Sequence, residues 1–161
     1  MLRIINYSHL VKTILLILLA IIIDQCTKIF ISKIMLENRF TTISVFSFLE
    51  LVFVRNTGIS FGLFSEGGSF NRYFFSTVSL SIGTMLIFIS FFINKKILRN
   101  AFIFISAGAI GNGLDRVYFG GVIDFIDFFI YNFHWPAFNL ADIFITIGVF
   151  FLILDSFVEN K

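Results

Sequence analysis

The stretch YFFSTVSLSIGTMLIFISFFI, residues 73–93, decides the fold class, because no charged residue interrupts the chain between Arg72 and Lys95. A helix needs roughly 20 mostly apolar residues to cross the hydrocarbon core of a bilayer, and this stretch has that length. Three further apolar stretches come close to it, at about residues 13–32, 100–117 and 138–157. The sequence therefore predicts an all-α integral membrane protein with four transmembrane helices.

The overall composition agrees with a bilayer environment. Of the 161 residues, 58% are hydrophobic and 14% are charged, whereas soluble domains are about half apolar and about a quarter charged. The basic residues are scattered and the net charge is only +2, so nucleic-acid binding is not expected. The length fits a single domain covering residues 1–161.

Acidic residues interrupt or border the other three apolar stretches, at Asp24, Asp115 and Asp142. Charged side chains at membrane depth are costly and usually mark functional sites. Lys95 and Lys96 lie in the short loop between the second and third stretches, which the positive-inside rule places in the cytoplasm. Both termini are then expected in the cytoplasm, and the three acids are expected near the extracytoplasmic leaflet.

Two outer segments connect these stretches. Residues 41–55 are rich in β-branched and aromatic residues, which predicts a short strand or hairpin on the outer surface. Residues 118–137 contain the turn signal Gly120-Gly121. Asn139 is placed to cap the fourth helix.

Asp124 and Asp142 are the pair expected to carry chemistry. Peptide hydrolysis without a metal needs a carboxylate that activates water and a carboxylic acid that polarises the carbonyl group. Two carboxyl groups held close together share one proton and supply both roles. Asp124 follows the Gly-Gly turn in a loop that we expect to fold back toward the bilayer, and Asp142 begins the fourth helix. Asp127 is the alternative to Asp124, or is simply a water-facing acid.

The other polar residues of this end each have two interpretations. Asp24 and Lys28 have the spacing of a helical ion pair, which favours a structural role over a catalytic one. Asn139 either caps the fourth helix or supports the site. Asp115 either belongs to the cluster or pairs locally with Arg116. Arg116 either organises the site or extends toward lipid headgroups.

Other chemistries lack the residues they need. The chain has only two histidines, His9 and His134, and neither lies near an obvious nucleophilic serine. The sequence has no HExxH motif and no histidine pair at ligand spacing, so a zinc peptidase is excluded and no metal or cofactor is expected. The glycines of AGAIGNG, residues 107–113, favour close helix packing over binding.

Five stretches, in chain order, resemble the motifs of the bacterial lipoprotein signal peptidases (signal peptidase II, an aspartic peptidase family). Together they extend over nearly the whole chain, and five motifs in the right order are highly specific. They are DQCTK at 24–28, VRNTGISFGLF at 54–64, GAIGNGLDRV at 108–117, GGVIDFIDF at 120–128 and FNLADIFITIG at 138–148.

The resemblance implies a fold, a reaction and a set of site residues. It implies four transmembrane helices with a small extracytoplasmic β-cradle and an outer loop. The implied reaction removes the signal peptide from diacylglyceryl-modified prolipoproteins in the bacterial cytoplasmic (inner) membrane, among membrane lipids, without a metal or cofactor, and is sensitive to globomycin-type inhibitors. Asp124 and Asp142 match the catalytic aspartates. The positions that match lining or supporting residues are Asp24, Lys28, Asn56, Gly58, Asn112, Arg116, Asn139 and Ala141.

Two other classes of function remain to be weighed. A small four-span proton-coupled transporter also needs intramembrane carboxylates, but its polar groups should lie near the midplane to be reached from both sides. In this chain the acids gather toward one end. A structural assembly factor would use the glycine-rich helix to pack a partner, and this leaves Asp124 and Asp142 without a role.

Overall fold

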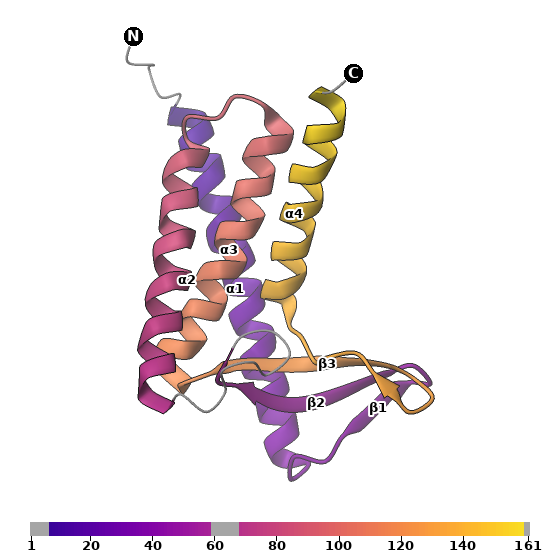
Figure 1. Cartoon of the computed structure of the whole chain (residues 1–161). Coiled ribbons are helices and arrows are strands. Elements are labelled where there is room, and N and C mark those ends of the chain that lie inside the picture. Colours follow the sequence, from indigo (N-terminus) through magenta and orange to yellow (C-terminus); the bar gives the residue numbers. More distant parts are fainter. Residues whose placement is uncertain (1–6, 59–67, 160–161) are drawn as a thin grey trace.

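The computed structural model describes residues 7–58 and 68–159, and within them the chain forms four α-helices and four β-strands (Figure 1). The helices are α1 (Tyr7–Glu37), α2 (Gly68–Ser90), α3 (Lys96–Phe119) and α4 (Leu140–Glu159). The strands are β1 (Ile43–Phe46), β2 (Leu49–Asn56), β3 (Val122–Ile130) and β4 (Phe133–His134). Residues 59–64 of the second motif lie outside the described residues.

Each of the four described helices is long and apolar enough to cross a membrane. This confirms the predicted fold class of four membrane-spanning helices with a small sheet. The helix ends differ from the expected ones, since α1 continues to Glu37 and α2 begins at Gly68 and ends at Ser90. The outward-facing side chains of the helices are largely apolar, as a lipid environment requires.

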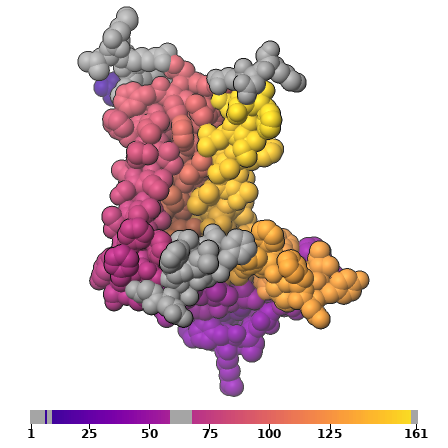
Figure 2. Space-filling model, in the orientation of Figure 1, coloured from indigo at the N-terminus to yellow at the C-terminus, as the bar shows by residue number. Residues whose placement is uncertain are grey.

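Helix α3 is the centre of the bundle, because it packs against α1, α2 and α4. Its glycines permit this close packing, as the sequence predicted. A Cβ atom at Gly108 would overlap the carbonyl oxygen of Ala141 on α4, and one at Gly111 would lie 2.6 Å from Oδ2 of Asp24 on α1. In Figure 2 the surface of α3 is visible in a groove between α2 and α4.

The sheet lies at one end of the helical bundle, across α1 and below α4 in the view of Figure 1. Within the described residues its strand order is β1-β2-β3-β4, with antiparallel neighbours. The predicted outer hairpin of residues 41–55 is present as β1 and β2. Phe125 of β3 packs on Ile31 and Met35 of α1, which joins the sheet to the bundle.

The expectation that Asp124 lies in a loop is wrong. Asp124 is on β3, where it pairs with Val54 of β2. The segment VIDFIDFFI is rich in β-branched and aromatic residues, which favour a pleated strand, and β2 supplies the backbone partner that a loop would lack. The Gly-Gly turn remains, with Gly120 in the left-handed conformation at φ 76° directly after α3.

Candidate active site

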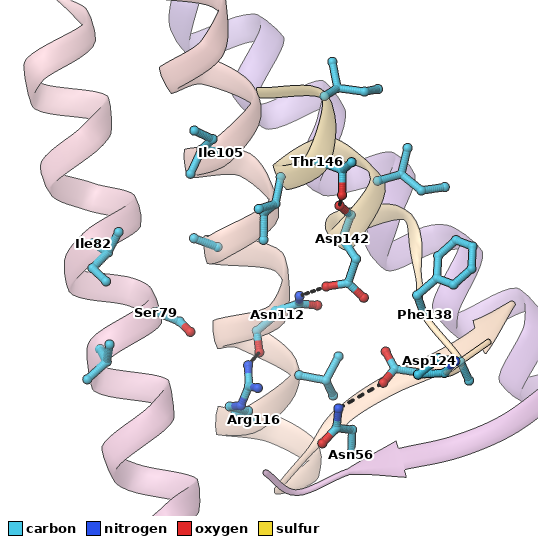
Figure 3. Close-up of a pocket in the computed structure, with 18 of the residues that line it drawn as sticks. Asn56, Ser79, Ile82, Ile105, Asn112, Arg116, Asp124, Phe138, Asp142 and Thr146 are labelled. Carbon is cyan, nitrogen blue, oxygen red and sulfur yellow. Dashed lines mark hydrogen bonds between the residues drawn. The ribbon is translucent and has the colours of Figure 1, made fainter. Parts of the chain in front are cut away.

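A cavity of about 750 Å³ opens between α2, α3, α4 and the inner end of the sheet (Figure 3). Most of its wall is apolar, and it comes from isoleucine and valine side chains of the three helices together with residues 135–138, the segment directly before α4. Its lower end in Figure 3 is polar. The polar lining residues of this end are Asn56, Asn112, Arg116, Asp124 and Asp142.

Asp124 enters the cavity from β3 and is 3% exposed. Its Oδ1 accepts a hydrogen bond of 2.6 Å from Nδ2 of Asn139, and its Oδ2 accepts one of 3.3 Å from Nδ2 of Asn56. Burial, and then the nearby charge of Asp142, raise the pKa of Asp124 to about 7. Asp124 therefore holds a proton at a pH where an ordinary aspartate has lost it.

Asp142 sits in the first turn of α4, where two reciprocal bonds form a capping box with Asn139. The Asp142 amide donates to Oδ1 of Asn139 at 3.1 Å, and the Asn139 amide donates to Oδ2 of Asp142 at 3.2 Å. An acidic residue is favoured in the first turn of a helix, where its side chain can accept free backbone N–H groups. Asn139 thus caps α4 and also bonds to Asp124.

Asn112 of α3 reaches the second carboxyl group. Its Nδ2 donates to Oδ1 of Asp142 at 2.8 Å (Figure 3). Its Oδ1 accepts bonds from Lys28 Nζ at 3.1 Å and from Asn139 Nδ2 at 3.3 Å. The positive charge of Lys28 therefore orients the amide group of Asn112, with its N–H side toward Asp142.

Lys28 is buried between two carboxylates. It lies 2.9 Å from Oδ2 of Asp24 and 2.7 Å from Oδ2 of Asp115. The structural ion pair expected for Asp24 and Lys28 is present, and Asp24 also accepts the backbone amide of Ala141 at 2.9 Å. Within the described chain, Asp115 forms its ion pair with Lys28 on α1 and not with the neighbouring Arg116.

Arg116 is 8% exposed and points into the protein, not toward headgroups. Its Nη2 donates to the carbonyl oxygen of Gly58 at 2.9 Å, and its Nη1 donates to that of Asn112 at 3.3 Å. Gly58 in turn donates its amide to Oδ1 of Asn56 at 3.1 Å. Arg116 therefore holds Gly58 and, through it, Asn56 at the end of β2 beside Asp124.

Asp127 does not line the cavity. Three positions separate it from Asp124 on β3, so the two side chains emerge on opposite faces of the strand. Asp127 pairs with Nδ1 of His134 at 2.8 Å, on the hairpin of β3 and β4. The geometry thus favours Asp124 over Asp127 as the partner of Asp142.

Sequence reasoning did not include Gln25 among the site residues and left open whether Asp115 belongs to the cluster, and the structure connects both to it. Gln25 Nε2 donates to Asp115 Oδ1 at 2.9 Å, and the amide of Ile123 donates to Asp115 Oδ2 at 3.2 Å. The available signal was helical spacing, because Asp115 lies three residues after Asn112 and so shares its face of α3.

In the part of the chain that the structure describes, four apolar helices, a sheet at one end and a cavity with two carboxyl groups define a multi-pass membrane protein with a polar site. The chain belongs to the signal peptidase II family, because residues 16–158 match the family model described as Signal peptidase (SPase) II. It is therefore a peptidase, which sets the transporter hypothesis aside.

Individual relatives agree with this family. The chain is 42% identical over 160 residues to a lipoprotein signal peptidase of Pelagibacter ubique, covering 98% of this chain and 95% of that protein. It is 37% identical over 140 residues to one of Cupriavidus pinatubonensis, covering 86% of this chain and 78% of that protein. A bacterial membrane enzyme solved by the in meso method superposes with a TM-score of 0.75 at 30% identity, covering 93% of this chain and 90% of the solved chain.

Proposed function

We propose that this protein is an aspartic endopeptidase that removes the signal peptide from diacylglyceryl-modified prolipoproteins, with Asp124 and Asp142 as its catalytic residues. The observation that carries the proposal is the placement of both carboxyl groups at the polar end of one apolar cavity, where Asn139 bonds to each of them. Membership of the signal peptidase II family supports the substrate class.

The two carboxyl groups have complementary roles in the proposed reaction. The ionised Asp142 takes a proton from a water molecule as the water attacks the scissile carbonyl carbon. Asp124, protonated because its pKa is raised, donates a hydrogen bond and then its proton to the carbonyl oxygen. Collapse of the tetrahedral intermediate breaks the C–N bond, Asp142 passes its proton to the leaving amine, and a hydroxyl group of the intermediate returns a proton to Asp124.

The walls of the cavity suit a membrane-borne substrate. Val78 and Ile82 on α2 and Ile105 on α3 form part of an apolar surface that leads to the carboxyl groups. A signal peptide helix would lie against this surface, and a globomycin-type inhibitor would compete for the same space. Apolar walls also exclude bulk water, which strengthens the electrostatic effects of the dyad.

We place the site at the extracytoplasmic leaflet and both termini in the cytoplasm, within a single domain covering residues 1–161. The sheet and the carboxyl groups lie at one end of the bundle, and both described chain ends lie at the other end (Figure 1). The loop between α2 and α3, which carries Lys95 and Lys96, lies at that other end too. Positive charges in short loops favour the cytoplasmic side.

The proposal is tested with the purified protein in detergent, in the presence of a metal chelator. A diacylglyceryl-modified prolipoprotein should be cut on the amino-terminal side of its modified cysteine, as shown by mass spectrometry of the product. The same precursor with an unmodified cysteine is the matched control and should be cut far more slowly. No cutting of the modified precursor would contradict the proposal, and turnover that stops with the chelator would contradict the metal-free mechanism.

The turnover number should depend on pH through Asp124. Its raised pKa means that the proton is present below about pH 7 and is lost above it. Because the mechanism needs this proton, kcat should fall about tenfold for each pH unit above 7. The measurement is kcat at saturating substrate between about pH 5 and pH 9. A kcat that rises through pH 7 would show that Asp124 acts in its ionised form.

A further inference from the structure

A buried polar cluster lies behind the two proposed catalytic aspartates and joins α1 to α3. It consists of Asp24, Gln25, Lys28 and Asp115, and we call it the bridge cluster. Lys28 Nζ contacts both carboxylates, at 2.9 Å from Asp24 and 2.7 Å from Asp115. Gln25 Nε2 also contacts both, at 3.1 Å from Asp24 Oδ2 and 2.9 Å from Asp115 Oδ1. The two carboxylates are therefore connected both through Lys28 and through Gln25.

Each carboxylate of the bridge cluster also holds one backbone amide outside it. Asp24 Oδ1 accepts the amide of Ala141 at 2.9 Å, and Ala141 directly precedes Asp142. Asp115 Oδ2 accepts the amide of Ile123 at 3.2 Å, and Ile123 directly precedes Asp124. The bridge cluster thus links the backbone beside one catalytic aspartate to the backbone beside the other.

The bridge cluster is so deeply buried that we expect it mainly to fix the geometry of the site and to add little to the folding stability. Asp24 and Asp115 are 0% exposed and Lys28 is 1% exposed. Removing charges from solvent costs free energy that the ion pairs only partly return, and apolar residues of similar volume are often as stabilising or more so. Hydrogen bonds to charged groups, however, fix directions and distances closely.

We propose that Gln25 and Asp115 are positioning residues, which act with Lys28 and Asp24 to set the separation of the Asp124 and Asp142 carboxyl groups. The inference rests on the proposed function of those two aspartates. Gln25 bonds to neither of them in the described chain, and it does not line the cavity. Its effect on the reaction is therefore transmitted through the two carboxylates it contacts, by Asp115 to the start of β3 and by Asp24 to the start of α4.

Gln25→Leu tests this proposal, since leucine is similar in volume and cannot donate a hydrogen bond. We expect kcat to fall by about 10- to 100-fold, because displacement of a reacting group by about 1 Å costs up to that much. The KM of the variant should stay within about twofold of the wild-type value. The pH above which kcat declines should also become lower. The charge of Asp142 contributes to the raised pKa of Asp124, and a greater distance between the two carboxyl groups weakens that contribution.

Two further substitutions separate positioning from general stability. Gln25→Lys keeps a donor of similar reach and should recover most of kcat. Thr27→Val is the matched control on α1. Among the described residues the Thr27 hydroxyl bonds only to carbonyl oxygens of its own helix, so kcat should be unchanged.

An unchanged kcat in Gln25→Leu would overturn the proposal. The proposal would also be overturned if kcat fell in Gln25→Leu, the pH above which kcat declines stayed the same, and Gln25→Lys did not recover kcat. A merely structural role of Gln25 would give that result. If instead the wild type does not cut the lipid-modified precursor, the function proposed for the site fails, and the positioning role fails with it.

Discussion

Asp124→Asn and Asp142→Asn should each lower kcat by about 10⁴-fold while the protein stays folded, because each removes one of the two proton-transfer groups. Asparagine keeps the shape of aspartate and can still accept the bond from Asn139 or Asn112. The double variant should be little slower than either single one, since the two groups act as a unit. The measurement is single-turnover cleavage of the diacylglyceryl-modified precursor.

Asp127→Asn is the matched control for this experiment. It makes the same chemical change on the same strand, but on the face that carries the pair with His134. Its kcat should remain within about twofold of the wild type, a range typical of a group outside the reacting centre. A collapse of activity in Asp127→Asn, with normal activity in Asp124→Asn, would reverse the assignment of the dyad.

Stability measurements distinguish loss of chemistry from loss of structure in these variants. Because burial raises the pKa of Asp124 to about 7, the ionised form costs folding free energy, and that cost is fully present above pH 7. Asp124→Asn should therefore be at least as thermostable as the wild type at about pH 8, and the advantage should shrink toward pH 5. A large loss of thermostability at both values would mean that misfolding explains the inactivity.

Gly108→Ala should produce the second largest loss, because it forces α3 away from α4 at the site. The new Cβ would overlap the carbonyl oxygen of Ala141 and lie 2.6 Å from the Ile145 side chain. The backbone oxygen cannot rotate away, so the helices must shift, at a cost of about 1–3 kcal/mol in folding free energy. Ala141 directly precedes Asp142, so the shift also displaces the carboxyl group of Asp142. This displacement should lower kcat by about 10²-fold.

Gly148→Ala is the control for this effect. A Cβ at Gly148 would lie 2.7 Å from the carbonyl oxygen of Ala101 and 2.6 Å from Ile105 Cγ1, so it wedges the same pair of helices. Gly148 lies six residues beyond Asp142, which is about 9 Å along α4. Both variants should lose thermostability in detergent, but only Gly108→Ala should lose most of its kcat. Equal losses of kcat would refute local positioning as the cause.

Much of the fold was predictable because its signals are local. The apolar run at 73–93 required a membrane span from its length alone, and the β-branched composition of 41–55 predicted the hairpin of β1 and β2. The strand at Asp124 was missed, because the preceding Gly-Gly signal described the turn correctly but contained no information on the partner strand.

The sequence by itself determined the apolar lengths that become spans, the outer hairpin and the family motifs that single out Asp124 and Asp142. Only the tertiary structure decided which face of β3 carries Asp124 into the cavity, that Asp115 pairs with Lys28, and that Gln25 connects two buried carboxylates. The physical reason is that span length and periodicity depend on neighbouring residues, whereas a buried polar group takes its partners from whichever helix or strand packs beside it. That packing depends on contacts along the whole bundle.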